Sequence, residues 1–144
     1  LLFTVLDLTG LVSFDSLLIN AGVEDKPAEH AQTEVHFIDV GQGDSTLVIS
    51  QGEVMLIDSG DKDDSNKIEK YLEKQGVTEL KYLIATHPHA DHIGEMSEII
   101  DQFHVDKFIM PKVKADMMHT TTIYEKMLKS IKAKGLKITQ AKPM

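Results

Sequence analysis

Three histidines and one aspartate lie within six consecutive positions of the stretch LIATHPHADHIGE. They are His87, His89, Asp91 and His92. Imidazole nitrogens and carboxylate oxygens are suitable ligands for zinc, manganese or iron. Such a dense group of these side chains indicates a metal site, and the plainer alternative is a set of surface or helix-capping histidines.

The spacing of this group predicts its arrangement. Pro88 disfavours helical angles at His87, so the segment up to His89 is expected to be extended. Side chains two positions apart in an extended segment point the same way, so His87 and His89 can bind one ion together. Asp91 and His92 lie beyond the bend and can face a second ion, and two ions roughly 3.5–4 Å apart can share and activate a water molecule. Asp91 can also orient the attacking hydroxide, which makes it the candidate catalytic residue.

The elements around the group alternate between strands and helices. An apolar strand leads into the group and a helix follows it, and the carboxyl ends of strands are where α/β proteins usually keep their chemistry. Gly52 can supply the positive φ of a tight hairpin, while Asp64 or Ser65 is expected to cap the first helix and Gly76 to end it. This alternation predicts an α/β sandwich with helices packed on a sheet. The expected strands cover residues 34–40, 45–50, 53–59, 80–86, 105–111 and 136–141, and the expected helices lie within residues 60–76, 93–103 and 121–135.

The composition suits one globular domain or part of a larger one. The chain has 144 residues, 42% of them hydrophobic, and no cysteine, so neither a disulfide nor a thiolate metal site can form. Its net charge is −8, with fifteen lysines and no arginine, which disfavours binding to nucleic acid. Residues 1–33 form an uncertain N-terminal segment and linker, the linker containing Pro27. Asp7 and Asp15 interrupt the apolar start, so neither a signal peptide nor a membrane span is expected there.

The sequence THPHADHIG matches the H-x-H-x-D-H signature of the metallo-β-lactamase superfamily. The sequence VHFIDVGQGDSTLVISQGEVMLIDSG resembles the opening strands of one of its branches, which contains the ComEC-like hydrolase domain of DNA-uptake competence proteins and choline-binding phosphodiesterases. The resemblance covers residues 34–144 and implies the N-terminal half of a metallo-β-lactamase-type αββα sandwich. It implies two divalent metal ions, zinc first and manganese or iron as alternatives. By this likeness His87 and His89 are ligands of the first ion, and Asp91 and His92 are ligands of the second.

The same resemblance gives roles to two further aspartates. Asp58, in LIDSG, is similar to the superfamily's buried aspartate, which supports the metal-binding loop without binding metal. Without the resemblance, Asp58 is equally well an ordinary turn residue. Asp44, in GQGDS, is placed at the edge of the site by the resemblance, whereas its sequence context alone predicts a β-turn.

The superfamily's remaining metal ligands lie in a second αβ half, and nothing after His92 resembles them. The full-length protein is therefore expected to be a metal-dependent hydrolase of phosphodiester or related ester bonds that uses a metal-activated water. The segment alone is expected to be inactive until the missing C-terminal half or a homodimer partner completes the ligand set. The alternative is an inactive or regulatory metal-binding or interaction module with the same fold. By resemblance only, the location is extracytoplasmic or membrane-associated in a bacterium.

Overall fold

The computed structural model describes residues 33–62, 66–113 and 122–141. All of them belong to one compact unit, Ala31–Met144. The prediction of an N-terminal segment and linker over residues 1–33 falls, apart from Thr33, outside the described residues.

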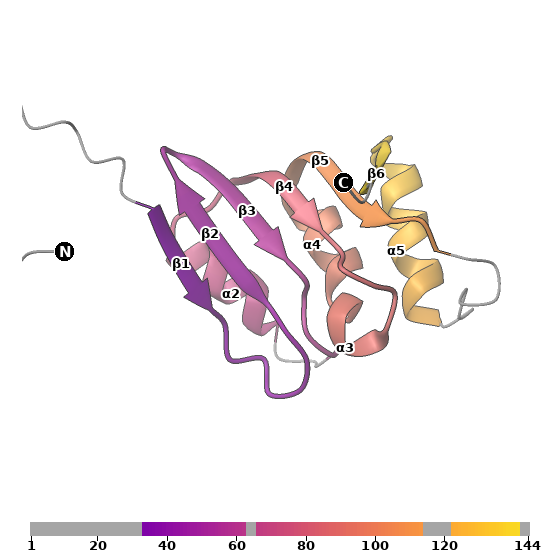
Figure 1. Cartoon of the computed structure of the whole chain (residues 1–144), viewed down its shortest axis with the longest axis horizontal. Helices are drawn as coiled ribbons and strands as arrows, with labels where there is room; N and C mark the ends of the chain where they lie inside the picture. The colour runs from indigo at the N-terminus through magenta and orange to yellow at the C-terminus, as the bar shows by residue number, and fades with distance from the viewer. Residues whose placement is uncertain (1–32, 63–65, 114–121, 142–144) are drawn as a thin grey trace, which may run out of the picture. The chain divides into compact units, whose positions relative to one another are not determined.

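The described part of the chain contains a six-stranded mixed sheet in which the strands follow one another in sequence order (Figure 1). The first three strands pair antiparallel, and the later pairs are parallel. The strands that pair in parallel therefore end at the same edge of the sheet, and a helix follows each of β3, β4 and β5. The strands are β1 (Thr33–Phe37), β2 (Thr46–Ser50), β3 (Glu53–Ile57), β4 (Glu79–Ile84), β5 (His104–Pro111) and β6 (Ile138–Ala141).

The hairpin between β2 and β3 forms at the predicted position. Ser50 pairs with Glu53 across a two-residue turn. Gln51 and Gly52 both have positive φ, 53° and 80°. Such a turn matches the twist of the strands on either side, and glycine adopts the second position without strain.

The helices α2, α4 and α5 lie on one face of the sheet, behind it in Figure 1. The helices are α2 (Lys67–Lys74), α3 (Ala90–Ile93), α4 (Met96–Gln102) and α5 (Thr122–Ala133). The α/β architecture predicted from the alternation of apolar segments is therefore confirmed. Among the described residues, none of these helices has the length and apolar character needed to cross a membrane.

The core lies between the sheet and these helices. Leucines and a phenylalanine occupy matching positions on four adjacent strands and are fully buried: Leu47, Leu56, Leu83 and Phe108. The helices bury apolar side chains in the same cluster, among them Ile68, Leu72, Ile99, Ile100 and Met127. Burial of each side chain of this size contributes about 1.5–3 kcal/mol, so this layer fixes the sheet edge that carries the histidines.

Two helix boundaries differ from the prediction. The helix expected over residues 93–103 is α4, which begins later, at Met96, and the short helix α3 precedes it; Gly94, between them, donates its N–H to the carbonyl of Gly60 at 2.9 Å. The N-cap of α2 is Asn66, in the left-handed conformation, while the predicted caps at 64 and 65 lie outside the described residues. Gly76 ends α2 as predicted, with φ 72°.

The opposite face of the sheet has no helix on it among the described residues (Figure 1). Val35 is 52% exposed and Phe37 is 83% exposed. Val48, Met55 and Tyr82 lie in register on this face and line a hollow of about 430 Å³. We call this uncovered apolar surface the open face.

Candidate metal centre

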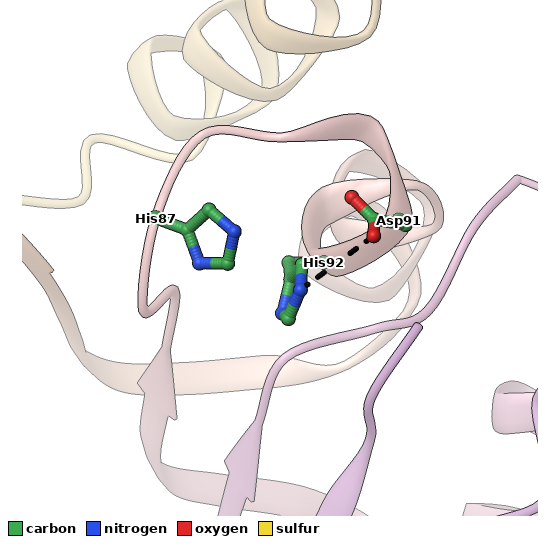
Figure 2. A group of neighbouring side chains, drawn as sticks. All are labelled: His87, Asp91 and His92. Atoms are coloured by element: carbon green, nitrogen blue, oxygen red, sulfur yellow. Dashed lines mark ion pairs between the residues drawn. The ribbon is translucent and has the colours of Figure 1, made fainter. Parts of the chain in front are cut away.

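The candidate metal centre lies where the loop after β4 meets α3: His87 is in the loop, and Asp91 and His92 are on α3. The side chains of His87, Asp91 and His92 point toward one another (Figure 2). Their ligand atoms all lie within 4.8 Å of one another, and each residue is partly buried. Because α3 begins immediately after the extended segment, Asp91 and His92 are brought back beside His87.

His89 lies next to this group. It is exposed, it has the extended angles φ −80° and ψ 148°, and it forms the N-cap of α3. Its ring centroid is 4.8 Å from that of His87. The sequence predicts that His87 and His89 bind one ion and that Asp91 and His92 bind the other. The described group instead joins His87 to Asp91 and His92, and His89 borders it.

Asp58 orients one imidazole of the centre. It is 2% exposed, and it accepts a hydrogen bond of 2.9 Å from Nδ1 of His92. This bond places the hydrogen of His92 on Nδ1 and leaves the lone pair of Nε2 for a metal ion, as is usual for metal-binding histidines. The prediction that Asp58 supports the loop agrees with this position.

β3 ends at Ile57, two residues before the end of the predicted strand, because the backbone leaves the extended conformation at Asp58. Its φ is +58°, in the left-handed region that non-glycine residues seldom occupy. Its N–H donates to the carbonyl of Ile84 at 2.9 Å, and its carboxylate accepts from the N–H of Thr86 at 2.7 Å. These bonds hold an unusual conformation at a site where backbone strain is commonly functional.

Thr86 is a further residue of the centre that the sequence did not single out. Its hydroxyl donates to Oδ2 of Asp58 at 2.5 Å and lies 3.0 Å from Nδ1 of His87. Since the only hydroxyl hydrogen goes to Asp58, Thr86 must accept the hydrogen of His87 Nδ1. One buried carboxylate thus orients both His87 and His92. The sequence feature that could have pointed to Thr86 is its position directly before the H-x-H-x-D-H motif.

The charge state of His87 suits metal binding. Burial, and then the nearby imidazoles of His92 and His89, lower the pKa of His87 below its usual value. The carboxylates of Asp58 and Asp91 oppose this shift but do not overcome it. His87 is therefore neutral near pH 7, the form in which imidazole binds a metal ion.

The segment after β3 holds the metal loop by backbone contacts. Ser59 donates its N–H to the carbonyl of His92 at 2.7 Å, and its hydroxyl accepts from the N–H of Glu95 at 3.2 Å. A Cβ on Gly94 would lie 2.2 Å from the backbone nitrogen of Lys62, so only glycine fits there. The loop that carries three ligand candidates is therefore fixed by main-chain bonds.

Asp44, which the resemblance placed at the edge of the site, lies near His92. Its Oδ2 is 3.9 Å from Nε2 of His92, and Oδ2 of Asp91 is 3.7 Å from the same nitrogen. Two imidazoles with their Nδ1 atoms engaged, together with adjacent carboxylates, form a donor set that fits a divalent transition metal. The residues that would hold it are His87, Asp91 and His92, with His89 beside them.

The fold and this donor set belong to a known class of protein. A sequence model of the metallo-beta-lactamase superfamily matches residues 38–142, and the chain belongs to that superfamily. Its proteins bind divalent metals, and membership suggests a metallohydrolase.

Particular relatives refine the class. The chain is 30% identical over 135 residues to ComE operon protein 3 of Bacillus subtilis (strain 168), covering 81% of this chain and 17% of that protein. It is 29% identical over 68 residues to "Probable metallo-hydrolase YqgX" of the same organism, covering 47% of this chain and 31% of that protein. The chain thus spans less than a third of the length of either relative. The resemblance to the ComEC-like branch is confirmed.

Solved structures agree on the fold. Metallo-beta-lactamase SMB-1 bound to 2-mercaptoethanesulfonate superposes with a TM-score of 0.51 at 20% identity, covering 62% of this chain and 35% of that one. A mutant metallo-beta-lactamase from Cronobacter sakazakii gives 0.50 at 22% identity, covering 58% and 34%. The predicted metallo-β-lactamase-type fold is therefore confirmed.

Proposed function

We propose that this chain contributes the first part of the active centre of a metal-dependent hydrolase of phosphodiester or related ester bonds. The observation that carries the proposal is the convergence of His87, Asp91 and His92, whose ligand atoms lie within 4.8 Å of one another. Asp58 accepts a hydrogen bond from Nδ1 of His92, which fixes the orientation of that imidazole. The ions expected are two, zinc first, with manganese or iron as alternatives.

Each residue has a separate task in this proposal. A bound divalent ion supplies Lewis acidity and lowers the pKa of the attacking water toward neutrality. Asp91, partly exposed beside His92, orients that water and accepts its proton. Thr86 and Asp58 keep the Nε2 atoms of His87 and His92 available by binding their Nδ1 sides.

The proposed substrate is a phosphodiester rather than a β-lactam. This preference rests on the likeness to ComE operon protein 3 and to the branch that includes choline-binding phosphodiesterases. The net charge of −8 favours a small ester over a long nucleic acid, whose phosphates the chain would repel.

We propose further that residues outside this sequence complete the centre. Catalytic zinc sites keep three protein ligands and one open position, so two ions need more ligands than the four predicted here. The open face also supports the proposal that further residues complete the domain, because Phe37 and Val35 on it are exposed apolar side chains. The second αβ half of the domain is the occupant we propose for this face, and a second copy of the chain is the alternative outcome of the test.

The test is metal binding followed by a substrate screen. Metal-free chain is re-equilibrated with zinc or manganese, and bound metal is measured by elemental analysis. We expect bound metal in the unchanged chain, its loss in His92→Ala and its reduction in His89→Ala. His104→Ala is the matched control, because His104 is an exposed histidine on β5 that contacts Asp106.

The longer protein that includes the second half is then screened with a chromogenic phosphodiester and a chromogenic β-lactam. Hydrolysis of the phosphodiester, lost in His92→Ala, supports the proposal. Metal binding without any hydrolysis in the completed protein would instead support the regulatory or interaction module. Equal metal content in the chain and in His92→Ala would contradict the metal centre itself.

A further inference from the structure

The loop between β1 and β2 is held against the metal centre by three hydrogen bonds. Gly60 donates its N–H to the carbonyl of Asp44 at 2.9 Å, and Asp61 donates to the carbonyl of Gln42 at 3.2 Å. The hydroxyl of Ser45 donates to the carbonyl of Asp58 at 3.0 Å. The loop therefore has a defined position relative to the segment that orients His92.

Gly43 brings this loop into direct contact with a ligand candidate. A Cβ built on Gly43 would lie 1.8 Å from the backbone oxygen of Asp91, and its φ is +91°. No other residue fits this approach, because both the space and the backbone angle exclude a side chain. Such close backbone contact holds the next residue, Asp44, at the edge of the centre, where its carboxylate approaches His92.

The carboxylate of Asp44 is aimed at a nitrogen that is open for a metal. Its Oδ2 lies 3.9 Å from Nε2 of His92, on the side opposite the bond to Asp58. Ligand atoms about 2.0–2.2 Å from a tetrahedral zinc ion lie about 3.4 Å apart. The separations of His92 Nε2 from Asp44 and from Asp91, 3.9 and 3.7 Å, exceed this value by only a few tenths of an ångström, which a small side-chain rotation can close.

The charges around His92 also require a cation. The carboxylates of Asp44, Asp58 and Asp91 all approach this one imidazole, at 3.9, 2.9 and 3.7 Å. Within the described residues, no lysine forms a salt bridge with any of these three carboxylates. Carboxylates gathered in this way repel one another, and a divalent ion offsets that repulsion.

We infer that Asp44 is an additional metal ligand, binding the ion at Nε2 of His92 once its carboxylate rotates toward that nitrogen. The inference rests on the proposed function and extends it, because it adds a ligand from the GQGDS loop to those of the H-x-H-x-D-H motif. Its side chain is 78% exposed, so it can reach the ion by rotation without moving the backbone. The loop then supplies a metal ligand in addition to connecting β1 with β2.

The test compares Asp44→Asn with the unchanged chain in a cobalt(II) titration, followed by calorimetry and by the visible absorption of the bound ion. We expect about a tenfold or larger loss of affinity at one site, with a changed absorption band because one ligand is replaced. Asp101→Asn is the charge-matched control, since Asp101 is exposed on α4 and contributes no side chain to the centre. This control should bind cobalt like the unchanged chain.

The remaining outcomes separate this inference from the proposed function. Unchanged affinity and spectrum in Asp44→Asn would overturn the inference, while loss of binding in His92→Ala in the same series would leave the proposed metal centre standing. A weaker affinity with an unchanged absorption band would show that Asp44 acts only through its charge, which also overturns the inference. If the unchanged chain binds no cobalt, the proposed metal centre fails and the inference fails with it.

Discussion

Thr86 shows how a residue that binds no metal can determine how two others do. Its hydroxyl connects the buried carboxylate of Asp58 to Nδ1 of His87, while Asp58 reaches His92 directly. Removal of the hydroxyl leaves the Nδ1 hydrogen of His87 without its acceptor. The ring of His87 can then rotate away from the position in which Nε2 faces the centre.

We predict that Thr86→Val lowers the affinity of the chain for zinc by about tenfold, the usual lower bound for the loss of an outer hydrogen bond to a metal-binding histidine. Isothermal titration of the metal-free chain with zinc measures the change. Thr86→Ser should keep most of the affinity, because it keeps the hydroxyl. Thr78→Val, an exposed threonine before β4, is the control, and equal affinity in all variants would contradict the role of Thr86.

The four candidate ligands could be predicted from the sequence because they are close together in it. The contact of Thr86 with Asp58 could not, since the residues are 28 positions apart and the bond depends on how β3 and β4 align. The same holds for the bond between Asp58 and His92, which are 34 positions apart. Only the family resemblance placed Asp58 near the centre.

At the scale of elements, the break between α3 and α4 is what shapes the centre. Gly94, between them, has ordinary helical angles, φ −55° and ψ −46°. Its requirement for glycine is therefore steric: a Cβ would lie 2.2 Å from the nitrogen of Lys62 and 2.4 Å from the carbonyl carbon of Asp61. Hydrophobic periodicity predicts the helix, but it contains no information about this contact between two backbones.

We predict that Gly94→Ala lowers the free energy of unfolding by about 1–3 kcal/mol, the typical cost of an added group in a packed site. It should also weaken zinc binding, because the segment 60–62 is pushed away from α3. Urea denaturation and zinc titration measure the two effects.

Gly52→Ala provides the comparison for this prediction. Gly52 has φ 80° in the β2–β3 turn, with no atom within 4 Å of the added Cβ, so alanine strains only the backbone there. We expect a loss of stability of about 1 kcal/mol and unchanged zinc affinity. Weakened zinc binding in this variant, or normal binding in Gly94→Ala, would show that the contact of α3 with the 60–62 segment does not shape the centre.

At the scale of the whole domain, the two faces of the sheet differ in what covers them. The helices bury one face completely at Leu47, Leu56 and Leu83. The open face carries Val35 and Phe37, both exposed. The alternation of strands and helices in the sequence predicted helices packed on a sheet, and only the arrangement of the helices shows which face is left uncovered.

We predict that the chain self-associates through this open face, because exposed apolar patches of this kind drive association in water. Phe37→Lys should shift sedimentation velocity profiles toward the monomer at high protein concentration. Ile138→Lys is the matched control: Ile138 is 41% exposed but pairs in register with buried Phe108, toward the helix-covered face. Equal association of both variants would show that the open face is not the contact surface.

The main-chain bonds that join Ser59 to His92, and Gly60 to Gly94, affect how the domain acquires its metal. Because these bonds join main-chain groups and use no metal-binding side-chain atom, they restrict the conformational freedom of the ligand-bearing segment independently of its ligands. Metal binding then needs little loss of loop entropy, so its free energy comes mainly from the ligands themselves. The choice between zinc, manganese and iron should accordingly depend on donor chemistry and metal supply in the cell, and little on the folding of the loop.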